Sequence, residues 1–428
     1  MASIIELADR LWTGKDSTES PEHHPFAPLD TIEEITTGVG FYKEFVNLTV
    51  LRTGEGAVLI DTGSFLPAQH ERSFAGVRRY ATEPVHSAIY THGHVDHAYG
   101  LPPFLREAES KGWQRPRVIG HEAVAPRMRR YVETDGYNGI INSRQFGGRI
   151  RWPTDPLPPT LAYSERLDLR VGESEVRLVH ARGETDDHTW VFLPESRVLC
   201  TGDLFIWAAP NAGNPQKVQR FAIEWATALR QMAALEPEFL LPGHGLPVIG
   251  AARVREALLD TALYLESLYQ QTVAAMNEGA TIYEILEHVR PPAELAAKPY
   301  LKPVYDEPDF IVRNVYRCLG GWYSGVPSEL KPSPRRQQAR EIASLAGGVS
   351  RLLARARECA EAGDLAMACH LVDWAADAEP ESGEVHKLRA DVYARRVFAE
   401  PSTMSRGIFG AAARDSQQRQ GEDETRDG

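Results

Sequence analysis

The chain has 428 residues, 43% of them apolar and 25% charged, which is the composition of a soluble globular protein with room for two domains. Its 59 acidic residues exceed its 47 basic ones, and the net charge of −12 argues against nucleic acid as a partner while leaving a small anionic substrate open. No apolar run reaches the roughly 18 residues of a membrane span, no secretory signal is evident and the four cysteines are scattered, so we expect a cytoplasmic protein without membrane partners.

The first part of the chain predicts an arm followed by a layered domain. Residues 1–40 are polar and rich in proline, and we expect them to form an N-terminal arm that lies on the body. Two β-rich runs joined by a glycine-containing turn, between Asn47 and Gly63, are typical of a hairpin. Further elements are expected in alternation: helix 71–82, strand 85–90, helix 102–112 and strand 117–120. This alternation indicates an α/β fold built from stacked layers.

The middle of the chain begins with a stretch that we interpret as a long loop. Residues 130–165 are rich in proline, and a loop of this length in a compact domain often covers an active-site mouth. β-rich runs then return, with a helical period before the last of them. The expected elements are strands 175–180, 189–193 and 197–201, helix 220–235 and strand 239–242.

Beyond Pro247 the pattern is helical. Residues 251–278 predict one long helix, a proline-marked connection follows, and residues 310–396 predict a series of helices. Their helix–turn–helix arrangement is TPR-like, although no clean repeat of roughly 34 residues is present. The polar, charged end of the chain is expected to be disordered.

A cluster of metal-binding side chains follows the strand expected at 85–90. It consists of His92, His94, Asp96 and His97. The four side chains converge if the strand ends near Tyr90 and the chain turns there, where Gly93 permits a bend. Imidazole and carboxylate ligands with no thiol nearby suit Zn²⁺ or a similar divalent ion. The alternative is a histidine-rich surface turn, for which so dense a cluster is unusual.

Three more metal-binding side chains each follow an apolar strand and lie beside a glycine: Glu184, Asp203 and His244. Because strand ends meet at one edge of a layered sheet, these side chains are placed to complete a site for two ions. A carboxylate is needed to bridge two cations, which favours this role for Asp203. Structural roles are expected for His121, His180 and Cys200, while residues 186–188 fit a surface turn as well as a supporting role.

Together these motifs resemble the metallo-β-lactamase superfamily of binuclear hydrolases, over residues 40–248. The resemblance implies an αββα sandwich that holds two Zn²⁺ ions. The implied ligands are His92 and His94 for the first ion, Asp96, His97 and His244 for the second, and Asp203 as the bridge between them. Most members supply a histidine as the third ligand of the first ion, whereas this chain has Glu184. A glutamate fills that position in the alkylsulfatase branch, although that branch usually bridges the ions with glutamate as well.

The C-terminal half is similar to the alkylsulfatase dimerisation domain. The similarity is carried by Tyr316-x-x-x-Gly320-Gly321-Trp322-Tyr323, Gly325-Val-Pro327, Gly347-Gly348 and Asp377-Ala-Glu-Pro380. It implies an all-α, TPR-like domain that forms an interlocked homodimer. The expected segments are an N-terminal arm (1–40), a catalytic domain (41–248), a helical linker (249–309), a helical dimerisation domain (310–412) and a disordered tail (413–428).

Residues that would bind the substrate are also suggested by the resemblance. Alkylsulfatases hold the sulfate group with asparagine and arginine in a segment after the bridging ligand. Asn211 matches the asparagine, but the Arg-Gly pair that follows it in the family is missing. Lys217 or Arg220 is expected to take its place, and Arg144, in a second segment similar to the family's, is another candidate. Because lysine lacks the bidentate contact that arginine makes to a tetrahedral oxyanion, sulfate as the substrate group stays open.

These features favour a hydrolase for the sulfate ester of a hydrophobic alcohol, a small-molecule substrate. Two cations, with Asp96 and Asp203 as catalytic ligands, would share one water, lower its pKa and hold it as a bridging hydroxide for attack. Phe146, Phe205 and Trp207 are candidates for an apolar pocket, and core packing explains them equally well. The alternatives are hydrolysis of a thioester, lactone or phosphoester, and a non-catalytic helical-repeat scaffold protein.

Overall fold

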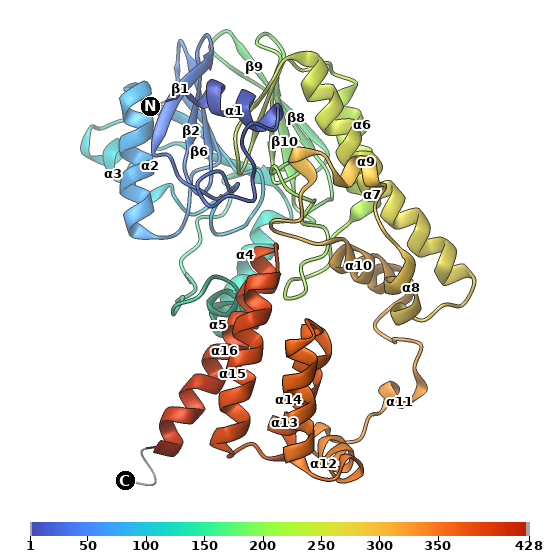
Figure 1. The fold of residues 1–428 in the computed structure, drawn as a ribbon. Helices are drawn as coiled ribbons and strands as arrows, with labels where there is room; N and C mark the ends of the chain where they lie inside the picture. Colours follow the sequence, from blue (N-terminus) through green and yellow to red (C-terminus); the bar gives the residue numbers. More distant parts are fainter. Residues whose placement is uncertain (1, 425–428) are drawn as a thin grey trace. The chain divides into compact units, whose positions relative to one another are not determined.

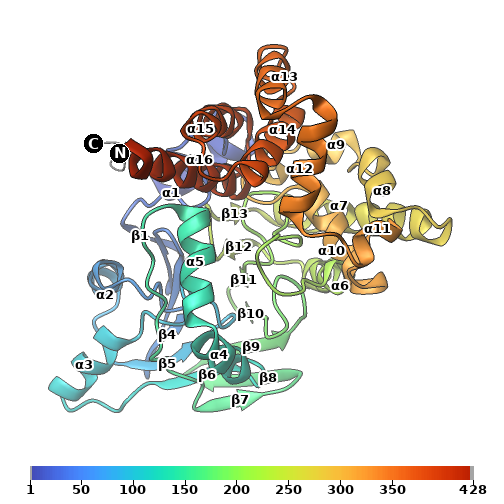
Figure 2. The same ribbon diagram turned by 90° about the horizontal axis from the view of Figure 1, so that it is seen from below.

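The computed structural model describes residues 2–424, which form two compact units (Figures 1 and 2). The first unit contains the chain up to Asp135 and again Trp152–Gly321, and the second contains Gly136–Arg151 and the chain from Trp322 on. The expected catalytic domain is therefore interrupted by a short segment that belongs with the C-terminal helices. Among the described residues, no helix combines the length and the apolar character that crossing a bilayer requires.

Seven strands form the first sheet, in chain order from one edge to the other. They are β1 (Thr31–Thr36), β2 (Val39–Lys43), β3 (Leu48–Thr53), β4 (Gly56–Ile60), β5 (Val85–Ile89), β6 (Arg117–His121) and β7 (Leu161–Tyr163). β1 to β4 pair antiparallel, which includes the expected hairpin, and β5 to β7 continue in parallel. The parallel strands need crossovers, and α2 (Pro67–Tyr80) and α3 (Pro102–Ser110) provide two of them. β4 is buried along its length, which explains its unbroken apolar run.

The second sheet has six strands in the order β13-β12-β11-β10-β9-β8. They are β8 (Arg166–Val171), β9 (Ser174–His180), β10 (Thr189–Leu193), β11 (Val198–Gly202), β12 (Phe239–Pro242) and β13 (Val248–Ile249). β11 and β12 are parallel and are connected through α6 (Ala222–Ala233), whereas the other neighbours are antiparallel. β9, β10, β11 and β12 lie close to the predicted ranges, because each is β-rich and bounded by polar or turn-forming residues, whereas no range was predicted for β8 or β13.

The two sheets pack face to face around one core, and helices cover their outer faces (Figure 1). Val58 and Ile89 of the first sheet and Val191 and Leu240 of the second belong to this core. α2 and α3 lie outside the first sheet, while α6 and α7 (Ala251–Asn277) lie outside the second. The expected αββα sandwich is confirmed.

The first unit extends beyond the expected catalytic domain at both ends. Residues 1–40 are more than an arm: a capping box between Ser3 and Glu6 starts α1 (Ile4–Trp12), and β1 opens the first sheet. Residues 249–309 are not a linker, because α7 packs on α6 and its apolar face joins the core of the sandwich. The remaining helices of this stretch are α8 (Ile282–His288), α9 (Ala293–Ala296), the 3₁₀ helix η1 (Pro299–Leu301) and α10 (Pro308–Gly320).

Residues 130–165 do not form one long loop. α4 (Val124–Glu133) and α5 (Asp135–Phe146) occupy the first part of this region, and the proline-rich stretch 149–159 has no helix or strand. In the second unit, α5 lies beside α16 (Thr403–Glu424), as Figure 2 shows. Gly407 permits this close approach, because a Cβ atom there would lie 2.0 Å from the carbonyl oxygen of Gln145.

The second unit is otherwise all helical, as the sequence predicts. Its remaining helices are α11 (Pro327–Leu330), α12 (Arg335–Ala346), α13 (Val349–Glu361), α14 (Leu365–Ala378) and α15 (Gly383–Ala399). Gly363 has a positive φ of 85° after α13, and the Asp364 side chain caps α14 by accepting a hydrogen bond from Met367 N–H. The tail predicted as disordered from residue 413 is instead helical to Glu424, because α16 packs along α15; residues 425–428 lie outside the described residues.

Candidate metal centre

Four loops of the first unit, each after a strand, carry the metal-binding side chains predicted from the sequence. The histidine cluster follows β5, Glu184 follows β9, Asp203 follows β11 and His244 follows β12. β4 and β5 are parallel in one sheet and β11 and β12 in the other, so their carboxyl ends open at the same edge of the sandwich. The structure therefore brings together all seven predicted ligands in two groups.

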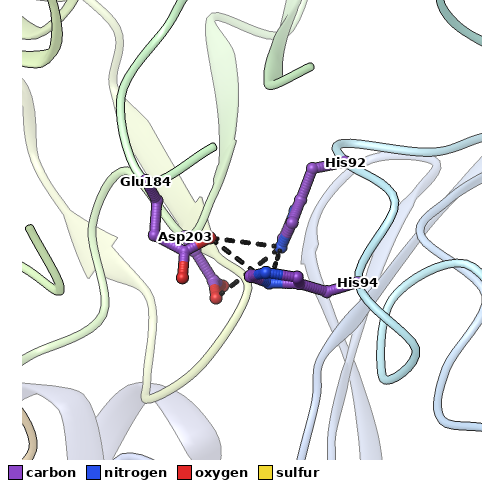
Figure 3. Close-up of side chains that lie close together, drawn as sticks. All are labelled: His92, His94, Glu184 and Asp203. Atoms are coloured by element: carbon purple, nitrogen blue, oxygen red, sulfur yellow. Dashed lines mark hydrogen bonds and ion pairs between the residues drawn. The ribbon is translucent and has the colours of Figure 1, made fainter. Parts of the chain in front are cut away.

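The first group consists of His92, His94, Glu184 and Asp203 (Figure 3). His92 Nε2 lies 2.7 Å from His94 Nδ1 and 3.5 Å from Glu184 Oε2. Glu184 Oε2 is also 3.3 Å from His94 Nδ1. Two imidazole nitrogens and a carboxylate oxygen thus point at one spot, which is the arrangement of ligands around a metal ion.

The second group consists of Asp96, His97 and His244. The Nε2 atoms of the two histidines lie 3.3 Å apart, and Asp96 Oδ2 lies 3.5 Å from that of His244. Asp203 reaches both groups: its Oδ1 is 3.3 Å from His97 Nε2, and its Oδ2 is 3.9 Å from His92 Nε2. One carboxylate therefore faces both groups with different oxygens.

The outer nitrogens of three imidazoles have partners that fix the ring orientations. His97 Nδ1 lies 2.8 Å from Asp61 Oδ2, and His244 Nδ1 lies 2.6 Å from the carbonyl oxygen of Phe45. His92 Nδ1 lies 3.0 Å from the Thr91 hydroxyl. Because Asp61 and the Phe45 carbonyl can only accept hydrogen bonds here, Nδ1 of His97 and His244 carries a proton, and Nε2 is the ring atom that faces the centre.

Two buried carboxylate oxygens support the interpretation as a metal centre. Glu184 Oε2 and Asp203 Oδ1 have no hydrogen-bond partner among the described residues. Buried polar atoms are almost always paired, since leaving one unpaired costs about 1–3 kcal/mol. Both atoms lie beside imidazole nitrogens of the kind that bind metal ions, so a cation is the partner that this geometry fits.

The electrostatics of the two groups also suit cations. Burial lowers the pKa of His92 and of His94 well below the ordinary value, so both offer lone pairs at neutral pH. Burial raises the pKa of Glu184 to about 7, against the opposing charge of Arg220. For His97, burial is outweighed by the carboxylates of Asp203 and Asp61, which hold its pKa well above the ordinary value. Metal and proton would compete for Nε2 of His97, as at many metal sites.

The predicted anion-binding residues have different surroundings from those expected. Asn211 Nδ2 donates to Glu184 Oε1 at 2.7 Å, and Arg220 Nη1 lies 2.6 Å from the same oxygen. Both side chains are buried and hold the Glu184 carboxylate, so Arg220 is not a free anion-binding cation. Lys217 is partly exposed, with Nζ 5.6 Å from the centre of the Trp152 ring. Arg144 belongs to the second unit, and its role in anion binding stays a prediction.

Further residues support the centre. The sequence did not identify Arg127, and it left residues 186–188 open between a surface turn and a supporting role. Asp187 is fully buried: it accepts a hydrogen bond from Gly93 N–H at 2.9 Å and one from Arg127 Nε at 2.9 Å, so it holds the histidine loop rather than forming a surface turn. His188 stacks on His92 with ring centres 4.6 Å apart. The three consecutive polar residues after Glu184 were the available signal, but a sequence does not show that Arg127, a helix residue, pairs with them.

The remaining candidates behave as structural residues. His121 and His180 stack on each other with ring centres 3.6 Å apart, and Cys200 is buried in β11. Phe205 and Trp207 are buried in the core of the sandwich, so they do not line a substrate pocket. A different aromatic set lies next to the first ligand group: the Tyr131 ring is 6.4 Å from His94, and Trp152 packs on Tyr131 at 5.4 Å and on Phe65 at 6.0 Å.

Comparison with known proteins agrees with this geometry. Residues 42–244 match the family model of the metallo-beta-lactamase superfamily, and residues 281–419 match that of alkyl sulfatase dimerisation. A linear primary-alkylsulfatase of a Pseudomonas species is 27% identical over 372 residues, covering 81% of this chain and 68% of that protein. An (R)-specific secondary-alkylsulfatase of Pseudomonas sp. is 25% identical over 391 residues, covering 85% of this chain and 58% of that protein.

A solved structure shows the same fold. The stereoselective inverting sec-alkylsulfatase Pisa1 from Pseudomonas sp. superposes with a TM-score of 0.81 at 22% identity, covering 91% of this chain and 66% of that one. The chain thus spans between 58% and 68% of the length of these alkylsulfatases.

Proposed function

We propose that this chain, which matches the family models of the metallo-beta-lactamase superfamily and of alkyl sulfatase dimerisation, is a metal-dependent hydrolase of sulfate esters. The observation that carries the proposal is the position of Asp203. Its two oxygens face two separate groups of metal-binding side chains, 3.3 Å from His97 and 3.9 Å from His92. A single carboxylate shared in this way is suited to bridge two cations.

The proposed cofactor is a pair of Zn²⁺ ions. His92, His94 and Glu184 would hold the first, Asp96, His97 and His244 would hold the second, and Asp203 would contact both. Nitrogen and carboxylate oxygen are the donors, and no cysteine lies in either group, which suits Zn²⁺ and leaves other divalent ions as competitors.

Such a pair supplies acidity that generates hydroxide from water at neutral pH, and positive charge that offsets the charge of a sulfate leaving group. Asp96 and Asp203 would serve as the catalytic carboxylates. Burial would raise the pKa of Asp96, but the charges of His97 and His244 outweigh it and keep its pKa below the ordinary value. Asp96 is therefore a carboxylate near neutral pH, ready to accept a proton or to hold a cation.

Substrate would approach beside Asp96 and His94. Their side chains are 25% and 17% exposed, whereas those of His92, His97 and Glu184 are at most 1% exposed. The Lys217 ammonium and the Tyr131–Trp152–Phe65 aromatic set flank the His94 side. We assign Lys217 to the sulfate group and the aromatic set to the apolar alcohol part of the ester.

Sulfate, rather than another ester group, is supported by the nature of the first ligand group and by the relatives. Glu184 stands where most of the superfamily has histidine, as in the alkylsulfatase branch, and the named relatives are a linear primary-alkylsulfatase and an (R)-specific secondary-alkylsulfatase. The cation that we assign to the sulfate group is Lys217, a partly exposed residue in the segment after Asp203.

The proposed assembly is a homodimer through the C-terminal helices. Large apolar side chains of the second unit are exposed, among them Leu345 (81%) and Phe398 (87%). The match of residues 281–419 to the family model of alkyl sulfatase dimerisation supports this assembly. Light scattering of the purified full chain should give twice its mass of 47.6 kDa.

A substrate panel tests the proposed activity. Alkyl sulfates, phosphodiesters, lactones and thioesters are assayed with enzyme stripped of metal and with enzyme reloaded with Zn²⁺. Alkyl sulfates should be hydrolysed with the highest kcat/KM, and only by the reloaded enzyme. Faster turnover of another ester class would reject sulfate as the substrate group, and full activity of the stripped enzyme would reject a metal-dependent mechanism.

A further inference from the structure

The structure contains a buried lysine that the proposed mechanism does not use. Lys43, at the end of β2, is 2% exposed. Its Nζ donates to the carbonyl oxygens of Glu44 at 2.6 Å, Ala27 at 2.8 Å and Pro25 at 3.2 Å. An ammonium group has three protons, and each is matched by one carbonyl. Burial lowers the pKa of Lys43 to about 7, against the opposing charge of Glu44.

These carbonyls belong to two chain segments that surround His244. Pro25 and Ala27 flank Phe26, whose ring lies edge-on to the His244 imidazole with centres 4.4 Å apart. The Pro25 carbonyl also accepts a hydrogen bond from Gly245 N–H at 2.9 Å.

The second segment orients His244 directly. Glu44 precedes Phe45, and the Phe45 carbonyl accepts the hydrogen bond from His244 Nδ1 at 2.6 Å. Phe26 and Phe45 also stack on each other, with ring centres 5.2 Å apart. Lys43 thus joins the segment that packs on the His244 ring to the segment that fixes its tautomer.

We propose that Lys43 is a positioning residue for the second cation, acting through Pro25–Ala27 and Phe45 to hold His244 in its ligating orientation. This inference rests on the proposed two-metal function. In this proposal, residues 25–27 support the metal centre, and only the second of the two cation sites depends on Lys43.

The first ligand group has separate supports, so the inference is specific to one site. His92 contacts Thr91, the Gly93 N–H is held by Asp187, and Glu184 is held by Asn211 and Arg220. Neither Lys43 nor the 25–27 segment is among these contacts. Loss of Lys43 should therefore weaken one site, whereas a purely structural role would weaken both sites together.

Titration of the metal-stripped full chain with Zn²⁺ by calorimetry tests the inference. The variants are Lys43→Met, Phe26→Ala and, as control, Lys298→Met, whose ammonium pairs with Glu256 and Asp260 at the surface of the same unit. Lys43→Met and Phe26→Ala should bind the first ion as the wild type does and the second about tenfold or more weakly, the usual cost of losing support around a metal ligand. Lys298→Met should match the wild type.

The outcomes separate this inference from the proposed function. Two ions bound with wild-type affinities by both variants would overturn the role of Lys43 while leaving the two-metal centre intact. Equal weakening of both sites would overturn it too. If Lys43→Met does not fold, Lys43→Gln takes its place, because it removes the ammonium and keeps a hydrogen-bond donor against the same carbonyls; Phe26→Ala, which leaves Lys43 in place, tests the contact of the Phe26 ring with His244. A wild-type chain that binds no ion would overturn the proposed function and, with it, the inference.

Discussion

Asn211 donates a hydrogen bond from Nδ2 to Oε1 of Glu184 at 2.7 Å, and this contact leaves Oε2 of the same carboxylate facing His92 and His94. Arg220 lies 2.6 Å from Oε1 as well. One oxygen is therefore held by the protein, and the other is left without a partner at the point where two imidazoles meet. This division leaves Oε2 of Glu184 available as the third ligand of the proposed first ion.

The first prediction concerns this contact. Asn211→Ala should weaken Zn²⁺ at the first site by about tenfold or more, because the Glu184 carboxylate loses a partner that orients it. Calorimetric titration measures the effect, with Asn277→Ala, at the exposed end of α7, as the matched control. Unchanged affinity in Asn211→Ala would show that Arg220 alone suffices to hold Glu184.

The second prediction separates Lys217 from Arg220. Lys217→Met should raise KM for an alkyl sulfate about tenfold or more with metal content unchanged, because a hydrogen bond to a charged group contributes about 1.5–3 kcal/mol. Arg220→Met should instead lose the first ion, since it removes the cation paired with buried Glu184. Steady-state kinetics and metal analysis on both variants check the two roles. A rise in KM confined to Arg220→Met, with both ions retained, would reverse the assignment.

The third prediction concerns the ion pair of Arg127 with Asp187, the residue that accepts a hydrogen bond from Gly93 in the histidine loop. Arg127→Met should lower the free energy of unfolding by about 3–5 kcal/mol, because it leaves the buried Asp187 carboxylate without its cation. Chemical denaturation of the metal-free chain measures the change. Arg129→Met, on the exposed side of α4, is the control and should cost less than about 0.5 kcal/mol. Similar stability of the two variants would mean that Arg127 does not stabilise the loop.

The fourth prediction is a pH dependence that arises from Asp306. Burial raises the pKa of Asp306 to about 7, although Gly213 N–H and Glu307 N–H donate to its carboxylate. The folded state then holds the proton more tightly than the unfolded state, so stability is present at low pH and is lost as the pH rises from 4 to 7.

Comparison with Asp306→Asn isolates this group. Because one pKa unit corresponds to about 1.4 kcal/mol, the wild type should lose up to about 4 kcal/mol relative to this variant between pH 4 and pH 8. Denaturation curves at several pH values measure the difference. A stability difference that stays constant over that range would show that Asp306 remains ionised in the folded chain.

The sequence was sufficient for the sandwich and for the seven candidate ligands, for a physical reason. Buried strands are continuous apolar runs, and a metal centre collects histidines and carboxylates at their ends, so His92 and Asp203 are visible without coordinates. Neither the pairing of Arg220 with Glu184 nor that of Arg127 with Asp187 was visible. A cation in a sequence gives no indication of which buried anion it faces.

The differences at the domain boundaries have a similar origin. α5 groups with helices more than 180 residues later in the chain, and contact at that separation leaves no local pattern. The polar end of α16 has the composition of a disordered tail, and only its packing along α15 shows that it is helical. The proline-rich start of the chain was interpreted as an arm, although α1 and the Phe26 segment pack on the sandwich and against His244.

The proposed centre requires that two cations share Asp203. Anomalous diffraction at the zinc edge, from crystals of the reloaded chain, locates both ions. We expect two peaks, one within about 2.0–2.2 Å of ligand atoms of His92, His94 and Glu184 and one at that distance from Asp96, His97 and His244, with an oxygen of Asp203 on each. A single peak, no peak, or two peaks of which one lies out of reach of Asp203 would contradict it.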